Sequence, residues 1–199
     1  GRPLVCHCLR TFARIIPADL TVLVVPDDLR EHFIACLQER SALSSVRIVA
    51  GGRTRQDSVM NGLAALPPAA KIVAIHDAAR PYTDASLIRR CIDSARELGS
   101  GVAARKVTDT IKLAGPDRRV LETKDRSVLW AAETPQVFAR TTIVEAYAHV
   151  RRLGISVTDE SQAVEILGKP VFLVEHTGQN TKVTYPIDLT RGGTGTELS

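Results

Sequence analysis

The segment KIVAIHDAARPYTDASLIRRCIDSARELG (71–99) decides the fold, because a strand pattern, a polar loop and a helix pattern follow one another in it. Residues 71–75 are almost all apolar, as is typical of a strand covered on both faces. Residues 84–99 form an amphipathic helix pattern, with Asp84 as the expected N-cap and Gly99 as the stop signal. A strand that leads directly into a helix indicates an α/β protein.

The same alternation continues on both sides of this segment. Residues 20–25, 46–50 and 170–175 are further short apolar runs, and residues 27–39 have apolar side chains four positions apart. We therefore predict an α/β fold with a mostly parallel sheet and helices on both faces. With 199 residues, of which 44% are hydrophobic and 24% charged, the chain suits one sizeable domain over 1–199.

Residues 102–138 interrupt the alternation, because they contain no helix pattern. KVTDTIKL (106–113) alternates like a strand, AGPDRR (114–119) supplies a turn, and VLETKDRSVLW (120–130) returns. A hairpin with so little core of its own is marginal in water. We expect a protruding β-arm that packs on a second subunit; the alternative is that it folds back on its own domain.

The charge pattern bears on the class of ligand. The formal net charge is +4, and the basic residues are scattered, with no basic run interleaved with aromatic residues. This pattern argues against a nucleic-acid partner and favours a small anionic ligand such as a phosphate. The chain contains no run of 18 apolar residues and no signal-peptide pattern, so we expect a cytoplasmic protein with no membrane partner.

The loop IHDAARP (75–81) is the first candidate site. Ligands of open α/β sheets bind beyond the carboxyl ends of the strands, which is where Asp77 and Arg80 are expected. The carboxylate could hold a divalent cation and the guanidinium a phosphate. The alternative is a salt bridge that only shapes the turn. We interpret His76, between the strand and the acid, as a structural histidine.

The segment GGRTRQDSVMNGL (51–63) is the second candidate, since it follows a strand and opens a helix. Its glycines allow close approach of the backbone to a ligand, and Asp57 or Ser58 can cap the helix or help present free N–H groups to an anion. Glycine turns before helices are common, so this segment alone identifies no site. Arg126 and Lys182 are lone cations, which are usually solvated, and Asp159 reads as a helix cap.

Six segments, taken together and in this order, resemble one family, the 2-C-methyl-D-erythritol 4-phosphate cytidylyltransferases of non-mevalonate isoprenoid synthesis. The segments are GGRTRQDSV (51–59), HDAARP (76–81), TDTIK (108–112), DRSVLWAAETPQVF (125–138), TDESQAVE (158–165) and NTKVTYPIDL (180–189). The resemblance implies a Rossmann-like nucleotidyltransferase fold and a homodimer in which the β-arm exchanges contacts. It also implies transfer of a cytidylyl group from CTP to methylerythritol phosphate, a small polyol phosphate, with release of pyrophosphate and Mg²⁺ as the cofactor.

The resemblance also implies roles for individual residues. Asp77 is the expected metal-linked acid, and Lys182 and Arg126 are the expected catalytic cations, with Lys182 bringing the two phosphates together. The residues expected to contact the nucleotide are Gly52, Ser58, Asp77 and Ala78. The residues expected to hold the methylerythritol phosphate are Arg80, Thr110, Arg126, Thr134 and Thr158, with the arm residues reaching the site of the neighbouring subunit.

This sequence departs from the family pattern at several points. The family opens with a strand and a glycine-rich loop that bears catalytic cations. We expect this sequence to begin after them, as an N-terminally incomplete domain with little activity. Lys106, Glu133 and His176 stand where the family usually has Pro, Gln and Gly. Two alternatives remain: a ribitol-5-phosphate-type cytidylyltransferase, or a non-catalytic dimeric nucleotide-binding module if the loop is absent from the gene.

Overall fold

The computed structural model describes residues 3–185 and 187–188, so both limits of the predicted 1–199 domain lie outside the described residues. The α-helices are α1 (Leu4–Ala13), α2 (Arg30–Gln38), α3 (Arg55–Ala65), α4 (Ala85–Leu98), α5 (Arg140–Arg152) and α6 (Glu160–Ile166). The strands are β1 (Val22–Val25), β2 (Arg47–Ala50), β3 (Ile72–Ile75), β4 (Ser100–Lys106), β5 (Lys112–Ala114), β6 (Val120–Thr123), β7 (Trp130–Ala139) and β8 (Leu173–Glu175). All four apolar runs predicted as strands are strands.

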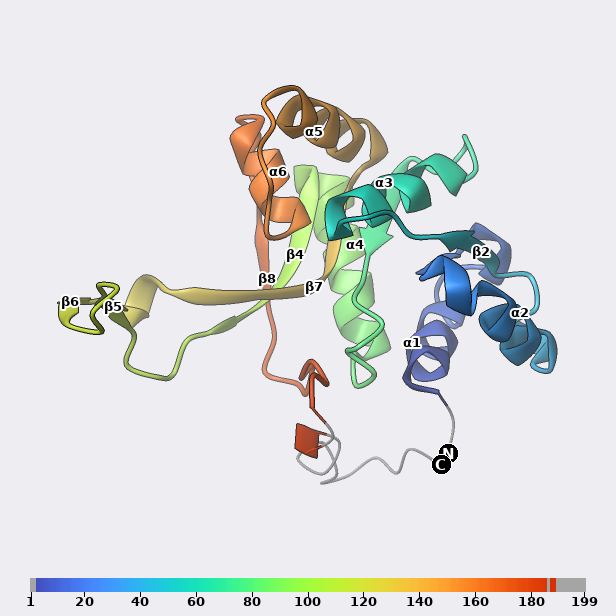
Figure 1. Ribbon diagram of the computed structural model, residues 1–199, viewed down its shortest axis with the longest axis horizontal. Helices are drawn as coiled ribbons and strands as arrows, with labels where there is room; N and C mark the ends of the chain where they lie inside the picture. Colours follow the sequence, from blue (N-terminus) through green and yellow to red (C-terminus); the bar gives the residue numbers. More distant parts are fainter. Residues whose placement is uncertain (1–2, 186, 189–199) are drawn as a thin grey trace.

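The central sheet has the strand order β3-β7-β4-β8 (Figure 1). Strand β8 is parallel to β4, whereas β7 is antiparallel to both β3 and β4. Three of the four strands therefore run in one direction, in agreement with the prediction of a mostly parallel sheet. The fourth runs against them because a hairpin excursion leads from β4 into β7, and strands joined by a hairpin are antiparallel.

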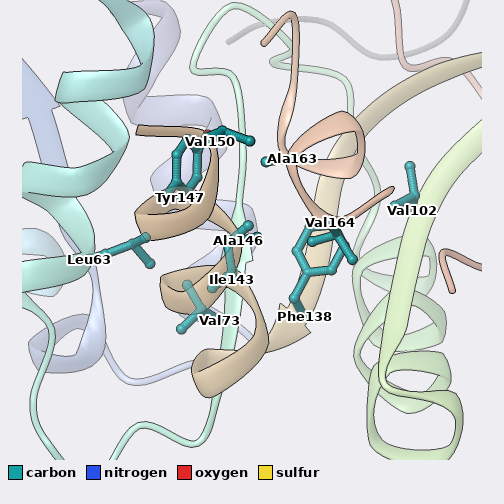
Figure 2. Packing of buried hydrophobic residues seen from close by; sticks show 10 residues of the cluster. All are labelled: Leu63, Val73, Val102, Phe138, Ile143, Ala146, Tyr147, Val150, Ala163 and Val164. Atoms are coloured by element: carbon teal, nitrogen blue, oxygen red, sulfur yellow. The ribbon is translucent and has the colours of Figure 1, made fainter. Parts of the chain in front are cut away.

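Adjacent residues of β7 show that helices cover both faces of this sheet. Phe138 packs with Tyr147 of α5 and Val164 of α6 in one buried cluster (Figure 2). Val137 packs with Leu87 of α4 in another. Because successive side chains of a strand point to opposite faces, the prediction of helices on both faces is confirmed. Burial of each large apolar side chain contributes about 1.5–3 kcal/mol relative to exposure.

Helix α4 begins and ends as its sequence predicts. The Asp84 carboxylate accepts a hydrogen bond from the Leu87 N–H at 2.9 Å. Gly99 has φ of 90°, the left-handed conformation that favours glycine at a helix end. The Asp84 cap fixes the residue at which α4 begins, shortly after the loop that follows β3, and Gly99 fixes the residue at which it ends.

Strands β1 and β2 form a separate parallel sheet, and helices α1 and α2 lie beside it (Figure 1). Val5 and Leu9 of α1 pack with Leu23 of β1 and Leu37 of α2 in a cluster of their own. Within the described residues, β1 and β3 are not hydrogen-bonded neighbours. An apolar cavity of about 490 Å³, lined by both strands and by α3, lies between the two sheets.

The predicted excursion over 102–138 is shorter in the structure, because its two ends are central strands. Val102 and Val137 are fully buried in the sheet. Only the part around β5 and β6 projects from the body (Figure 1), and both of these short strands are exposed along their length. The predicted turn is present, with the Gly115 N–H donating to the Arg119 carbonyl at 3.0 Å.

The alternation in KVTDTIKL predicted a strand over 106–113, whereas the paired residues of β5 are only Lys112–Ala114. The reason is local. The Val107 N–H donates to the Leu129 carbonyl, and the Lys124 N–H donates to the Ile111 carbonyl. Residues 108–110 lie between these two bonds and face the short 3₁₀ turn Arg126–Val128, which cannot form the regular hydrogen bonds of a paired strand.

Within residues 3–185 and 187–188, none of the helices combines the length and the apolar character that crossing a membrane requires.

Candidate active site at the end of strand β3

Asp77 lies two residues beyond β3, at the carboxyl end of the strand. Its backbone N–H donates to the Thr134 hydroxyl at 3.0 Å, and its carbonyl accepts from the Arg80 N–H at 3.0 Å. The neighbouring strand β7 and a tight turn therefore fix the backbone of Asp77. The carboxylate, with 19% of the side chain exposed, points to the rim of the sheet where ligands of such folds bind.

His76 is a half-buried histidine whose two ring nitrogens both have partners, which agrees with the predicted structural role. Its Nδ1 is 3.0 Å from the Thr134 hydroxyl and its Nε2 is 3.3 Å from the Arg80 carbonyl. Burial, which outweighs the opposing contributions of the Arg80 carbonyl and the Asp77 charge, lowers the pKa of His76 to about 4. The imidazole is thus neutral at physiological pH and holds the Asp77 loop against β7.

Three cations from separate parts of the chain surround the Asp77 carboxylate. Lys182, after β8, donates to Oδ2 at 2.9 Å. The Arg80 Nε is 4.0 Å from the same oxygen, and the Arg55 Nη2, in the first turn of α3, is 3.5 Å from Oδ1. The predicted residues Asp77, Arg80 and Lys182 are therefore brought together. One carboxylate faces three cations, of which Arg55 and Arg80 also contact a buried glutamate.

The pKa of Asp77 reflects these three neighbouring cations. Burial raises it, but the hydrogen bond from Lys182 and the charges of Lys182, Arg55 and Arg80 outweigh burial, so the pKa lies below the ordinary value of 3.8. Asp77 is therefore ionised at neutral pH. Three cations close to one carboxylate are suited to binding a negatively charged ligand.

The glycine segment before α3 folds as a capped helix start. Thr54 and Asp57 form a capping box, and the Ser58 hydroxyl accepts a hydrogen bond from the Gly52 N–H at 3.0 Å. A Cβ at Gly52 would lie 2.2 Å from the Asp57 Cβ, so only glycine fits this position. Gly52 and Ser58 are therefore adjacent, as their shared predicted role requires.

The cavity between the two sheets links this helix start with Asp77. Ser58, Arg55, Asp77 and Ala78 are among the residues that line it. The predicted nucleotide-contacting residues thus gather at one place, where β3 ends and α3 begins.

Arg55 was not singled out in the sequence, yet it connects two parts of the site. It forms two hydrogen bonds with Glu160 of α6, at 2.5 and 3.0 Å, and the Tyr147 hydroxyl also donates to Glu160. Although burial lowers the pKa of Arg55, the hydrogen bond and charge of Glu160 raise it above its ordinary value. The sequence signal was weak, because Glu160 in TDES reads as an ordinary first-turn acid and nothing local indicates that it is fully buried.

Three predicted substrate-binding residues lie elsewhere. Arg126 and Thr110 are exposed on the arm, where the Arg126 Nη1 donates to the Thr108 carbonyl at 2.7 Å. Thr158 is exposed before α6, with its N–H and its hydroxyl both bonded to Gln162. Asp159 caps α6, as predicted, by accepting from the Gln162 N–H. None of the three contacts Asp77 in the described part of the chain, and the arm points away from the body (Figure 1).

Thr134 is a different case. It lies against the site, but it is 4% exposed, and its hydroxyl already bonds to the Asp77 N–H and to His76. Its evident role in this structure is to support the Asp77 loop.

Comparison with known proteins agrees with this geometry. The family model described as IspD, 2-C-methyl-D-erythritol 4-phosphate cytidylyltransferase, matches residues 1–194. The enzyme of that name from Pelotomaculum thermopropionicum is 39% identical over 191 residues, which cover 96% of this chain and 80% of the relative. The bifunctional enzyme IspD/IspF of Desulfotalea psychrophila is 42% identical over 190 residues, which cover 95% of this chain. The chain spans 48% of that relative's length.

Solved structures give the same result. The 4-diphosphocytidyl-2C-methyl-D-erythritol synthase of Anaerococcus prevotii matches 96% of this chain and 88% of its own, with a TM-score of 0.87 at 29% identity. A fold of this kind, a cation-rich rim around Asp77 and a family match over nearly the whole sequence lead to one conclusion. This chain belongs to the 2-C-methyl-D-erythritol 4-phosphate cytidylyltransferase family, whose members are nucleotidyltransferases.

Proposed function

We propose that this chain transfers the cytidylyl group of CTP to 2-C-methyl-D-erythritol 4-phosphate in isoprenoid precursor synthesis. A phosphate oxygen of methylerythritol phosphate attacks the α-phosphorus of CTP, the bond from that phosphorus to the bridging oxygen breaks, and pyrophosphate leaves. The observation that carries the proposal is the meeting of Arg55, Arg80 and Lys182 around Asp77, beside the glycine segment that opens α3. Transfers of this kind need positioning and charge neutralisation more than covalent catalysis.

Different residues bind the two substrates. Gly52, Ser58 and Ala78 hold the nucleotide near Asp77, where the structure has them close together. Lys182 reaches the rim with half of its side chain exposed, so its ammonium group can turn from Asp77 to the phosphates of both substrates. Arg80 and Thr158 contribute to binding of the methylerythritol phosphate, and Thr134 supports the Asp77 loop.

Magnesium is the proposed cofactor, and the donor set limits how it is held. In the described part of the chain, no group of three His, Cys, Asp or Glu side chains could hold a metal ion. A single carboxylate fits Mg²⁺ whose other ligands are water and phosphate oxygens, which is how this ion usually binds beside nucleotides. Asp77 would therefore hold Mg²⁺ only together with the CTP phosphates, where the ion would neutralise part of their charge.

Homodimerisation through the arm is a further part of the proposal. In one subunit, Thr110 and Arg126 lie on the arm and do not contact Asp77. Leu113, Val120 and Leu121 on the arm are 47–57% exposed, so the hairpin presents apolar surface that a second subunit would cover. Arg126 of one subunit would then complete the site of the other. A cytoplasmic location for the reaction is also part of the proposal.

The cavity between β1 and β3 supports a strand preceding Gly1. Both strands lie along an apolar cavity and neither is bonded to the other within residues 3–185 and 187–188. An extended apolar segment inserted there would hydrogen-bond to both edges and join the two sheets into one. A variant with an extended apolar segment added before Gly1 should therefore melt at a higher temperature; an unchanged melting temperature would count against the strand.

The test of the function is pyrophosphate release by the full-length protein, with CTP and either methylerythritol phosphate or ribitol 5-phosphate. We expect release with the first and little with the second, and only in the presence of Mg²⁺. The Asp77→Asn variant should need a higher Mg²⁺ concentration for half-maximal rate. A preference for ribitol phosphate, or no turnover with either, would refute the proposal.

A further inference from the structure

Glu133 of β7 lies outside the site described above, but four groups from different parts of the chain meet at its carboxylate. Arg105 of β4 donates to Oε1 at 3.0 Å. At Oε2 the Asn180 Nδ2 donates at 2.7 Å, the His176 Nε2 lies at 3.1 Å, and the Arg80 Nη1 lies at 3.5 Å. A carboxylate that is 7% exposed is stable only with such partners.

Most of these contacts lead to the segment that carries Lys182. Asn180 uses its amide to donate to Glu133 and, at 2.9 Å, to the Thr134 carbonyl, while its side-chain oxygen accepts from the Thr83 hydroxyl. Its backbone carbonyl accepts from the Arg80 Nη1 at 2.7 Å. Every polar group of the Asn180 side chain is therefore bonded, and its position two residues before Lys182 is fixed.

His176 fixes the start of the same segment. Its Nε2 faces Glu133, and its Nδ1 is 3.1 Å from the Gly178 carbonyl, so the ring bridges β7 and the turn that follows β8. At the other end the Val183 N–H donates to the Ala79 carbonyl at 2.7 Å. The segment between β8 and Lys182 has no helix or strand of its own, so side-chain anchors of this kind must set its course.

Arg80 is held by the same carboxylate. Its guanidinium lies between Glu133, 3.5 Å from Nη1, and Asp77, 4.0 Å from Nε. That Nε is buried and has no hydrogen-bond partner among the described residues. Glu133 and the Asn180 carbonyl therefore restrain Arg80 through Nη1, whereas its Nε lies near Asp77 without a hydrogen bond.

We propose that Glu133, acting through Asn180 and His176, is a positioning residue that holds Lys182 and Arg80 at the reacting phosphates. The proposal rests on the proposed function for its kinetic consequence, although the geometry it concerns can be measured separately. Glu133 and His176 are also two of the three positions at which the sequence departs from the family pattern, and in the structure they are in direct contact. A carboxylate and an imidazole thus stand together where Gln and Gly were expected.

The kinetic test compares Glu133→Ala, Glu133→Gln and Arg105→Met in the full-length protein. We expect Glu133→Ala to lower kcat about tenfold to a hundredfold, because displacement of a catalytic group by about 1 Å has such an effect, and to change the KM for CTP less than about threefold. Glu133→Gln keeps an oxygen that accepts from Asn180 and should recover most of kcat. Arg105→Met is the matched control: it removes a partner of the same carboxylate but leaves the Lys182 segment untouched, so kcat should stay within about twofold.

The second measurement does not depend on activity. Hydrogen exchange of the Val183 amide, which is bonded to Ala79, should become at least about tenfold faster in Glu133→Ala and remain unchanged in Arg105→Met. If Glu133→Ala does not fold, Asn180→Asp serves instead, since it places two carboxylates together. Its exchange should be faster, and the double variant Glu133→Gln with Asn180→Asp should partly restore protection.

The outcomes separate the two proposals. If exchange at Val183 is faster in Glu133→Ala but neither the wild type nor any variant shows turnover, the positioning role stands and the proposed function is refuted. Normal turnover and normal exchange in Glu133→Ala, or in Asn180→Asp, would show that the carboxylate only stabilises the fold and would overturn the positioning role.

Discussion

At the scale of single residues, the main feature is the gathering of three cations around the carboxylate of Asp77. One carboxylate faces Lys182, Arg55 and Arg80, and its pKa lies below 3.8 because their attraction outweighs the effect of burial. Of the three cations, Lys182 has a long, half-exposed side chain with a single hydrogen bond to Asp77, whereas the guanidinium groups of Arg55 and Arg80 are also tied to buried carboxylates. Lys182 is therefore the cation most able to follow a substrate.

Lys182→Ala should abolish most turnover and leave the fold intact. Loss of one stabilising group at a developing negative charge costs about a hundredfold to a thousandfold in kcat. The half-exposed ion pair itself contributes about 1 kcal/mol or less to stability. Lys71→Ala, at the opposite end of β3, is the matched control for pyrophosphate release and thermal unfolding. A variant at position 182 with the wild-type rate would show that this lysine is a bystander.

Arg55 has a larger structural role, because its partner Glu160 is fully buried. Arg55→Met should lower the free energy of unfolding by about 2–3 kcal/mol, at the low end for buried pairs since Arg55 is 42% exposed. The triple variant Arg55→Met, Glu160→Leu and Tyr147→Phe should recover much of the loss, because it leaves no buried polar group of this cluster without a partner. Urea unfolding measures each variant, and Arg53→Met, on the exposed side of the same turn, should change nothing. Equal stability of Arg55→Met and wild type would contradict this view of the pair.

At the scale of elements, the helix starts determine where the site residues point. The capping box of α3 directs Ser58 to Gly52, and the Asp84 cap fixes α4 immediately after the loop that carries Asp77 and Arg80. Burial raises the pKa of Asp84, but hydrogen bonds from Ser86 and Leu87 together outweigh it, so the pKa lies below 3.8. The cap is therefore fully formed at neutral pH.

Asp84→Ala should lower the free energy of unfolding by about 1 kcal/mol at pH 7. Because the folded-state pKa is depressed, the contribution of Asp84 is present above the unfolded-state pKa and is lost as the pH falls through the folded-state value. The difference in stability between wild type and variant should therefore shrink below pH 3.8. Urea unfolding at pH 7 and pH 3 measures it, with Asp84→Asn as a neutral residue that still caps. A difference that persisted in acid would mean that the charge of Asp84 has no part in the cap.

At the scale of the whole molecule, two apolar surfaces of the described residues are left uncovered in a single subunit. One is the cavity that separates the β1–β2 sheet from the central sheet. The other is the arm, which points away from the body (Figure 1) and whose side chains Leu113, Val120 and Leu121 are exposed. Both are surfaces that a folded protein normally covers, and a second subunit is the proposed cover for the arm.

Mixing two inactive variants tests this arrangement. Lys182→Ala damages the site in the body, and Arg126→Ala damages the arm. In a mixed dimer the body of the Arg126→Ala subunit receives an intact arm, so one site of two is restored. After random exchange half of the dimers are mixed, and about a quarter of the wild-type rate should return. Exchange without recovery would show that the arm does not serve the partner's site.

The sequence by itself determined the elements and the rim on which the site lies. The strands at 20–25, 46–50, 71–75 and 170–175, the cap at Asp84 and the stop at Gly99 depend on near neighbours, and local patterns encode such interactions directly. The position of Asp77 and Arg80 beyond β3 followed from the general rule for open sheets. The family resemblance then added Lys182 as a candidate, which no local pattern singles out.

Only the tertiary structure decided which distant residues meet. The pairing of Arg55 with Glu160 spans 105 positions, and the network from Glu133 to Asn180 spans 47. Periodicity does not distinguish a buried acid from a solvated one, because both can stand at the same place in a helix start or a strand. The energy of a charged group depends on its burial and on the charges packed around it, and these exist only once the chain has folded.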